Sequence, residues 1–285
     1  MEIIAYAKIN IGLDVVGKLD NGYHSLKSVM QQVDLYDVIT LSVREMPVVF
    51  LESNSNIIPL DATNLAYRAA ELMRNTYRIE KGVAIYIDKR IPMAAGMAGG
   101  STDAAAVIEG MNVLFDLKLS KEEMQRVGVK LGADIPFCLQ HGCALCEGIG
   151  DVITPLNNNT QMTVLIAKPD IDVSTAHVYK SLQHDKLVHP DMNKVVAGIT
   201  KGDLKTVCSS MGNVLESVTA SEYEIIDALK ASMIKCGAAG SMMSGSGPTV
   251  FGLFEDMKEA KRAEQVLKVQ YPNIFVQAVN VVNNA

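Results

Sequence analysis

Apolar and polar residues alternate along much of the first forty-five positions of this chain. The alternation covers residues 3–16, 25–33 and 38–43, and a period of two is typical of half-buried strands. The turn at residues 18–22 contains an Asn-Gly pair, which favours a tight hairpin connection. The sequence therefore predicts that the chain begins with a hairpin followed by a third strand.

Helical spacing appears after residue 60. Residues 62–79 carry apolar side chains at intervals of three and four, after a possible cap at Asp61 or Thr63. Ser120 and Glu123 match a capping box and predict a helix that ends near Gly132. Other helices are expected at residues 101–115, 174–183, 192–200, 203–217, 221–236 and 258–270. Other strands are expected at residues 82–88, 143–146, 162–167, 250–254 and 274–281.

This order of elements predicts an α+β protein of two domains. The polar segment at residues 155–160 is the best candidate boundary, and it divides the chain into residues 1–156 and 157–285. Hydrophobic residues make up 48% of the 285 positions and charged residues 20%, which is typical of a globular protein with a full core. We expect no membrane span and no signal peptide, and so a cytoplasmic location.

The net charge and the cysteine content exclude few functions, but they make some functions less expected than others. The net charge of −6 disfavours a nucleic-acid partner, although an acidic chain can still bind a nucleotide through backbone N–H groups and a cation. Cys143 and Cys146 have C-x-x-C spacing, but no second pair completes a zinc site. We therefore interpret the cysteines as structural thiols.

The segment Pro92–Ala106 is the strongest chemical signal in the chain. A predicted strand precedes it, it contains Gly96, Gly99 and Gly100, and an Ala-rich helix follows. Backbone N–H groups at such a helix start can bind phosphate. The glycine spacing fits neither a Walker A loop nor a dinucleotide fingerprint. The alternative is a tight turn of small residues that packs closely.

Residues outside the glycine-rich segment are further candidates for the functional site, and each also has a purely structural interpretation. Asp134 can accept a hydroxyl proton, or it is a turn residue. Lys8 and Asn10 share one face of a strand, which either lines a cleft or faces solvent. Tyr23 and His24 suit a planar base, or they are ordinary surface residues near a turn.

Hydroxyl groups and a second glycine-rich loop complete the set of candidates. Ser101 and Thr102 can coordinate Mg²⁺, as hydroxyls do in other phosphoryl-transfer sites. Asp103 is the nearest carboxylate, yet as a first-turn residue it can simply complement the helix dipole. The loop Gly245–Gly247 either approaches a ligand closely or only turns the chain.

Three blocks together make the chain resemble the GHMP kinase superfamily across nearly its whole length. They are Ala7–Leu13, Pro92–Ala106 and Ser244–Phe251. Further residues resemble the members that act on a cytidine-diphosphate-linked methylerythritol. These residues are Gly22–His24, Leu131–Phe137 and Gly142–Gly150.

The resemblance implies a fold and a reaction. It implies an N-terminal domain of ribosomal-protein-S5 type that carries ATP and a C-terminal α/β-sandwich domain, with substrate between them. The implied reaction, in isoprenoid precursor synthesis by the non-mevalonate route, transfers the γ-phosphoryl group of ATP to the tertiary C2 hydroxyl of the methylerythritol part. The implied cofactors are ATP and Mg²⁺, and the expected state is a monomer or a weak homodimer, with neither nucleic acid nor membrane as a partner.

The resemblance also assigns roles by motif position. It makes Asp134 the base and Lys8 its partner, while Ser101 is the Mg²⁺ ligand expected from its hydroxyl chemistry. The residues implied to bind ATP are Asn64, Pro92, Met93, Ala94, Ala95, Gly96, Met97, Ala98, Gly99, Gly100, Ser101 and Thr102. The residues implied to bind substrate are Asn10, Tyr23, His24, Thr175, Tyr179 and Gly245. Two alternatives stay open: a kinase of homoserine or mevalonate type, and a non-catalytic nucleotide-binding module.

Overall fold

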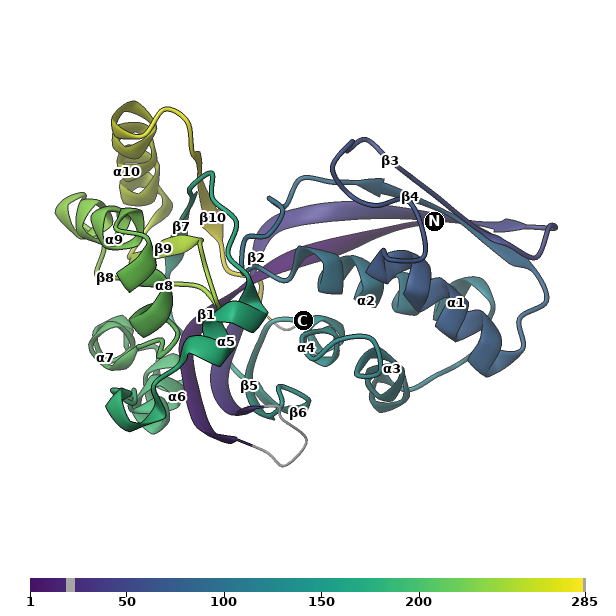
Figure 1. Cartoon of the computed structure of the whole chain (residues 1–285), viewed down its shortest axis with the longest axis horizontal. Helices are drawn as coiled ribbons and strands as arrows, with labels where there is room; N and C mark the ends of the chain where they lie inside the picture. Colours follow the sequence, from purple (N-terminus) through teal and green to yellow (C-terminus); the bar gives the residue numbers. More distant parts are fainter. Residues whose placement is uncertain (19–23, 284–285) are drawn as a thin grey trace. The chain divides into compact units, whose positions relative to one another are not determined.

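The computed structural model describes residues 1–18 and 24–283 of the chain (Figure 1). Its contacts divide the chain into two compact units. Unit 1 contains Met1–Ala7, Leu35–Ile91 and Ala98–His141, and unit 2 contains Lys8–Asp34, Pro92–Met97 and Gly142–Ala285. In the part of the chain that the structure describes, no helix is long and apolar enough to cross a membrane.

Helices and strands are mixed throughout the chain, as the sequence predicts. The strands are β1 (Glu2–Lys18), β2 (His24–Arg44), β3 (Val49–Ser53), β4 (Gly82–Asp88), β5 (Cys143–Gly148), β6 (Val152–Leu156), β7 (Thr163–Lys168), β8 (Gly240–Met243), β9 (Val250–Phe254) and β10 (Phe275–Asn280). The α-helices are α1 (Leu65–Tyr77), α2 (Gly99–Leu114), α3 (Lys121–Gly128), α4 (Ile135–Gln140), α5 (Thr175–Ser181), α6 (Met192–Lys201), α7 (Leu204–Ser210), α8 (Glu216–Glu222), α9 (Ile225–Lys235) and α10 (Met257–Gln270). A 3₁₀ turn, η1, covers His184–Lys186.

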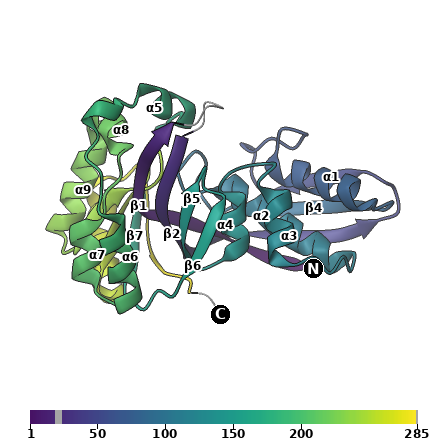
Figure 2. The ribbon, with the colours of Figure 1, turned by 90° about the horizontal axis from the view of Figure 1, so that it is seen from below.

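Unit 1 is a sheet with helices along one face. The C-terminal half of β2 pairs antiparallel with β4, and β3 lies parallel to β4 on its other side. Leu41 stands opposite Ile85 and both are buried, whereas Tyr86, opposite Thr40, is 41% exposed. This alternation turns one face toward helices α1 and α2, which Figures 1 and 2 show along the strands.

Unit 2 contains two groups of strands. The N-terminal half of β2 pairs antiparallel with β5, which in turn pairs with β6. A separate antiparallel sheet has the order β10-β7-β9-β8 and packs against α9 and α10. Leu165, Phe254, Met243 and Leu267 are buried in the hydrophobic cluster formed by this sheet and its helices.

Most predicted elements are present, with shifted ends, but the single helix expected at residues 203–217 is wrong. Helix α7 ends at Ser210 because Met211 is extended, with ψ of 147°. The chain becomes helical again in α8, which begins at Glu216, and the helix expected at residues 221–236 is α9, which begins only at Ile225. Tyr223 then separates α8 from α9 with another extended backbone. Apolar spacing continues across these breaks, so periodicity alone does not reveal them.

Helix caps were predicted with mixed success. Ser120 and Glu123 form the expected capping box at α3. At α1, however, neither Asp61 nor Thr63 is the cap, because Asn64 accepts the N–H of Ala66 at 2.8 Å.

The sequence also did not predict β3, β6, β8 or the short helix α4. The predicted hairpin turn falls on residues 19–23 and lies outside the described residues.

A buried ion cluster of Asp37, Lys89 and Asp103 lies within unit 1. Lys89 Nζ donates to Asp37 Oδ2 at 2.5 Å and to Asp103 Oδ2 at 2.8 Å. The side chains of Lys89 and Asp103 are each 5% exposed and that of Asp37 is 0% exposed. Asp103 is therefore neither the Mg²⁺-side carboxylate nor the simple dipole partner that the sequence suggested. It is a buried member of this cluster, and its Oδ2 atom accepts from Lys89 Nζ.

Burial changes the ionisation of this cluster. Desolvation raises the pKa of Asp103 to about 8, with Asp37 adding repulsion, while Lys89 opposes the shift. The two carboxylates hold the pKa of Lys89 above its usual value despite its own burial. Asp103 Oδ1 is buried with no hydrogen-bond partner among the described residues, and such an atom is costly to leave charged. At neutral pH Asp103 is thus protonated, while Lys89 carries its positive charge.

This ionisation predicts how Asp103→Asn alters stability with pH. Native Asp103 keeps its proton up to about pH 8, whereas the unfolded carboxyl loses it near pH 4, so this group lowers wild-type stability as pH rises between those values. Asn has no such proton. We expect the Tm of Asp103→Asn relative to wild type to rise by roughly 2–4 °C or more from pH 5 to pH 8, measured by calorimetry. Asp116→Asn, at a carboxylate that is 81% exposed, is the matched control, and a flat difference for Asp103→Asn would show that Asp103 is ionised when folded.

Candidate functional site

The glycine loop at residues 92–102 has the backbone of an anion-binding turn. Ala94, Gly96 and Ala98 have φ values of 47°, 67° and 58°, in the left-handed region. Ala98 is the N-cap of α2 and makes no side-chain cap bond, and the N–H of Thr102 donates to Ala98 O at 2.9 Å. The helix thus begins at Gly99, two residues before the predicted start. The first N–H groups of α2 have no partner within the helix and can donate to an anion.

Within unit 2, the first half of this loop contacts the second glycine-rich loop. A Cβ atom at Gly96 would collide with Ser244 O and would lie 3.0 Å from Gly247 O. Ser244 Oγ donates to Gly96 O at 3.0 Å, across 148 positions of sequence. Gly245 has φ of 59°, and a Cβ there would lie 3.2 Å from Gly96 O. Both loops therefore need glycine for this close approach.

Lys8 and Asn10 also lie at this meeting of loops in unit 2. Their side chains share one face of β1, and both residues are buried, at 3% and 1% exposure. Lys8 Nζ donates to Asn10 Oδ1 at 2.7 Å and to Gly96 O at 3.3 Å, and the backbone N–H of Lys8 donates to Met97 O at 3.1 Å. The solvent-facing alternative for Lys8 is wrong, because the side chain is held inside the protein.

Two residues that the sequence did not single out support the second loop. Asn213 Nδ2 donates to both Met243 O and Gly245 O at 2.8 Å, and it is 8% exposed. Thr219 Oγ1 donates to Ser246 O at 3.1 Å. Neither residue lies in a glycine-rich motif, so only the fold reveals these roles. Thr175, a predicted substrate residue, shares a 2.8 Å hydrogen bond with Ser246 Oγ.

Rings from three elements of unit 2 stack beside one another. His24 of β2 stacks on Tyr179 of α5 at 5.1 Å between ring centroids and 28° between ring planes. His184 of η1 stacks on His24 at 5.3 Å and 12°. Burial lowers the pKa of His24, and the charges of His184 and Lys18 add to this effect. The structure therefore brings His24 and Tyr179 together, while Tyr23 lies outside the described residues.

Other predicted site residues belong to unit 1. Asp134 is the N-cap of α4, so a short helix, and not the expected strand, follows it directly. Asn64 uses its side chain to cap α1 and to donate to Pro59 O at 2.8 Å. Ser101 and Thr102 lie in the first turn of α2, where Thr102 is buried at 2% exposure. The meeting of Asp134 with Lys8, which belongs to unit 2, stays a prediction.

Cysteines and other metal-ligating side chains do not form a centre in the described part of the chain. Among those residues, no group of three or more His, Cys, Asp or Glu side chains could hold a metal ion. Cys143 is a free, buried cysteine, and burial raises the pKa of its thiol to about 12. This is the expected state of a structural thiol.

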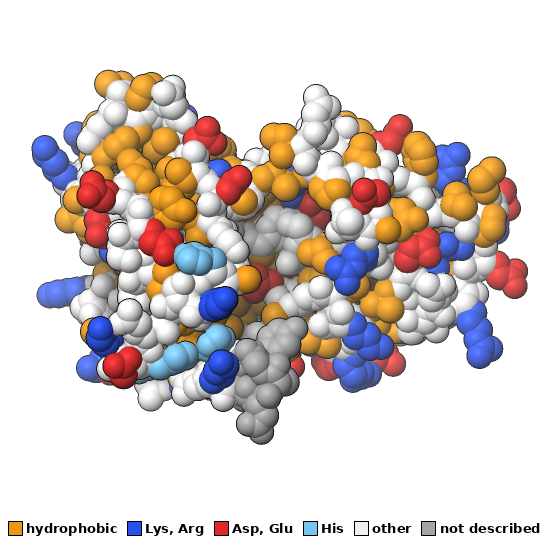
Figure 3. Space-filling view, in the orientation of Figure 1, with side chains coloured by type: hydrophobic (Ala, Val, Ile, Leu, Met, Phe, Trp, Pro, Cys, Tyr) orange, Lys and Arg blue, Asp and Glu red, His pale blue; other side chains and the backbone are white. Residues whose placement is uncertain are grey.

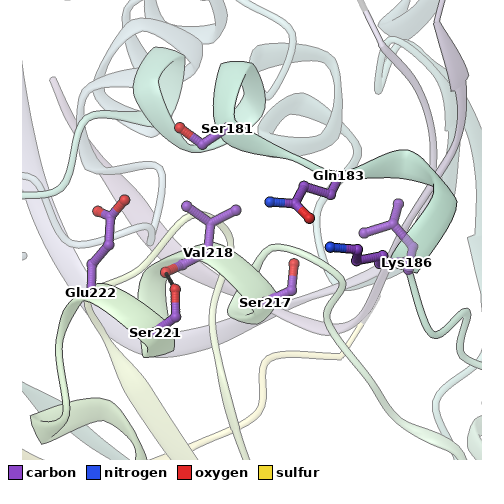
Figure 4. Close-up of a pocket in the computed structure, with 8 residues that line it drawn as sticks. Ser181, Gln183, Lys186, Ser217, Val218, Ser221 and Glu222 are labelled. Atoms are coloured by element: carbon purple, nitrogen blue, oxygen red, sulfur yellow. Dashed lines mark hydrogen bonds between the residues drawn. The ribbon is translucent and has the colours of Figure 1, made fainter.

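A cavity of about 390 Å³ lies in unit 2, beside the helix that carries Tyr179 (Figure 4). Its lining comes from the end of α5, the η1 segment and α8, and includes Lys186, Ser217 and Glu222. Ser221 Oγ donates to Val218 O at 2.7 Å, the dashed line in the figure. The lining contains none of the predicted site residues.

On the face drawn in Figure 3, Lys and Arg side chains are interspersed with Asp and Glu.

Comparison with known proteins gives matches along nearly the whole chain. Residues 64–142 match the model of the GHMP kinases N terminal domain, and residues 195–273 match GHMP kinases C terminal. A 4-diphosphocytidyl-2-C-methyl-D-erythritol kinase of Clostridium botulinum (strain Alaska E43 / Type E3) is 46% identical over 278 residues, covering 97% of this chain and 99% of that protein. The protein of the same name from Alkaliphilus metalliredigens is 46% identical over 272 residues, covering 95% of this chain and 94% of that protein.

Solved structures agree with these matches. A crystal structure of 4-(cytidine 5'-diphospho)-2C-methyl-D-erythritol kinase aligns with a TM-score of 0.82 and 28% identity, covering 98% of this chain and 99% of that one. A homoserine kinase from Cytophaga hutchinsonii also aligns with a TM-score of 0.82, at 21% identity, over 99% of this chain and 95% of that one, which shows the fold alone. With its two-domain fold of mixed helices and sheets, the chain therefore belongs to the GHMP kinase family of ATP-using, small-molecule kinases.

Proposed function

We propose that this chain phosphorylates the C2 hydroxyl of 4-diphosphocytidyl-2-C-methyl-D-erythritol with ATP, in the non-mevalonate route to isoprenoid precursors. The observation that carries the proposal is 46% identity over 97% of the chain to a protein of that kinase name. A kinase of homoserine or mevalonate type is the alternative, since such structures share the fold at 21% identity or below. A non-catalytic nucleotide-binding module is the second alternative.

The glycine loop is the proposed ATP site. The first N–H groups of α2 lie at the positive end of the helix dipole, which suits a phosphate. Loop residues 92–97 and the first residues of α2 would hold the phosphate chain through backbone donors, which need no particular side chain. Asn64 would contribute beside the nucleotide, although its side chain caps α1 in this structure.

Ser101 fits the proposed role of a Mg²⁺ ligand. Its hydroxyl lies in the first turn of α2, while Asp103, the nearest carboxylate in sequence, is committed to Lys89. Mg²⁺ in such sites takes most of its ligands from phosphates and water, so the Ser101 hydroxyl would be one protein ligand beside them. ATP supplies the transferable phosphoryl group, and the cation offsets charge on its phosphates.

Asp134 and Lys8 are the proposed catalytic residues. The acceptor hydroxyl would give its proton to the Asp134 carboxylate while its oxygen bonds to the γ-phosphorus and the bond to the ADP oxygen breaks. Lys8 would stabilise the charge that develops on the acceptor oxygen, and Asn10 and Gly96 O hold its ammonium group in place. A tertiary hydroxyl is hindered, so its placement matters more than the strength of the base.

The ring stack is the proposed site for the cytosine base. Tyr23 and His24 would hold the base, with Tyr179 as the other ring, and Asn10, Thr175 and Gly245 would contact the rest of the substrate. The stack of His24 on Tyr179 supports this assignment because it places two planar groups side by side. The bond from Thr175 to Ser246 supports it by joining α5 to the second glycine loop.

Other expectations from the sequence stay predictions. They are an ATP-binding domain at residues 1–156, a substrate-side domain at 157–285, a cytoplasmic location and a monomer or weak homodimer without nucleic-acid or membrane partners. The two family matches lie on either side of the expected boundary, which supports the division.

Acceptor choice is the first test of the proposed function. With Mg²⁺-ATP, we expect ADP release with the cytidyl methylerythritol compound and none above background with homoserine or mevalonate. The measurement is a coupled ADP assay across the three acceptors. Turnover with a different acceptor would replace the proposed substrate and keep the kinase, whereas silence with all three would favour the non-catalytic alternative.

Replacing the proposed base separates chemistry from binding. For Asp134→Asn we expect kcat to fall by about 10²–10⁴, the contribution of a general base, with the Kd of ATP within about twofold of wild type. The amide keeps the size of the side chain but cannot accept the proton. Asp116→Asn removes an exposed carboxylate from unit 1 and should keep full kcat. An unchanged kcat in Asp134→Asn would exclude this residue as the base.

Removing the ring of Tyr179 should raise the KM of the cytidyl acceptor but not that of ATP. Stacking of a base on an aromatic ring is worth about 1–3 kcal/mol, so we expect Tyr179→Ala to raise the KM of the cytidyl acceptor roughly 5–100-fold. The KM of ATP should stay within about twofold, and Tyr179→Phe, which keeps the ring, should resemble wild type. Steady-state kinetics of both substrates check this. Equal increases in both KM values would point to a general loss of structure instead.

A further inference from the structure

One buried ion cluster contacts the chain on both sides of the glycine loop. Lys89 lies three positions before Pro92, and Asp103 directly follows Thr102. We propose that the Asp37–Lys89–Asp103 cluster positions the phosphate-binding start of α2 by tying the entry and the exit of this loop to β2. The three are positioning residues, since their side chains are directed toward one another inside unit 1.

Asp37 holds the entry of the loop. Its Oδ1 atom accepts the backbone N–H of Arg90 at 2.5 Å and of Ile91 at 2.8 Å, while its Oδ2 atom accepts from Lys89. Asp37 belongs to β2, in the centre of the unit 1 sheet between its partners. One carboxylate thus fixes three consecutive residues of the segment that leads into the loop.

Lys89 holds the exit of the loop. Its ammonium group donates to Asp103 in the first part of α2. It also lies directly against the first residue of that helix, since a Cβ atom at Gly99 would be 3.0 Å from Lys89 Nζ and 3.2 Å from Ile91 Cγ2. The helix start therefore rests on the ammonium group and the end of the entry segment. A side chain at residue 99 would force them apart.

This inference rests on the proposed ATP binding by the loop, so the test measures nucleotide binding without turnover. The Kd of a non-hydrolysable ATP analogue with Mg²⁺ is measured by calorimetry at pH 7. We expect Lys89→Met and Asp103→Leu each to raise it at least about tenfold, because the helix start loses its tie. Asp103→Asn, which keeps an acceptor for Lys89, should stay within about threefold. Lys81→Met is the matched control, since Lys81 is 54% exposed and pairs only at the surface with Glu45.

A comparison of the two KM values distinguishes this role from a merely structural one. In Lys89→Met, the KM of the cytidyl acceptor should stay within about twofold of wild type while that of ATP rises. Equal increases in both KM values would show a general loss of structure and would overturn the positioning role.

The outcomes separate the inference from the proposed function. No analogue binding to wild type would overturn the ATP site itself. Binding to wild type and to Lys89→Met with equal Kd would overturn the positioning role alone. If Lys89→Met does not fold, the double variant Lys89→Met/Asp37→Asn removes the unpaired buried carboxylate and keeps an acceptor for Arg90 and Ile91. Wild-type affinity in that folded double variant would equally refute the role of Lys89.

Discussion

The contact between the two glycine-rich loops is the constraint on which the site in unit 2 depends. At Gly96 the backbone of one loop lies against Ser244 O and Gly247 O of the other, with no room for a Cβ atom. Ser244 Oγ then donates to Gly96 O, and Lys8 Nζ donates to the same carbonyl. One carbonyl therefore joins the first strand, the middle loop and the C-terminal loop. Motifs that are far apart in sequence hold their positions through this shared acceptor.

Two buried ammonium groups lie beside the glycine loop, one at Gly96 and one at Gly99. Lys8 donates to the carbonyl of Gly96 within the loop, and Lys89 lies against Gly99 at the helix start. A buried ammonium group is costly unless oxygens satisfy it. Lys8 is satisfied by Asn10 on its own strand and by the distant Gly96 O, and Lys89 by carboxylates of two other elements. These contacts join the loop to β1 and the helix start to β2.

How far the sequence could predict this protein depends on the range of the interactions involved. The alternation that buries Leu41 and Ile85 is local and predicts strands correctly. The second and third expected strands, however, are one continuous strand, β2. The order of strand, glycine loop and helix is local too, and it located the loop correctly. The break between α7 and α8 begins at the extended Met211 and covers residues 211–215 inside a run of helical spacing, and no local pattern reveals it.

Burial of polar groups was harder to predict than secondary structure. In the sequence, Lys8 and Asn10 also fit a solvent-facing pair on one strand face. Their burial could not be predicted because Gly96, whose carbonyl accepts from Lys8, is 88 positions away. Asp37 looks like an ordinary strand residue, and only the pairing of β2 with β4 brings it to Lys89. Asn213 supports the second loop from a segment without any motif. Such roles follow from tertiary contacts, which a single sequence does not encode in its local pattern.

In this family, similarity of the backbone does not determine which acceptor a kinase phosphorylates. Two solved structures, one a kinase of a cytidyl compound and one a homoserine kinase, align with the same TM-score of 0.82. Kinases of different acceptors therefore share this fold, and the acceptor must be selected by side chains placed on it. In this chain the ring stack of His24, Tyr179 and His184 is the group that we propose for that selection. These planar, partly polar rings suit a nucleobase, whereas homoserine, without an aromatic ring, would leave their stacking faces unused.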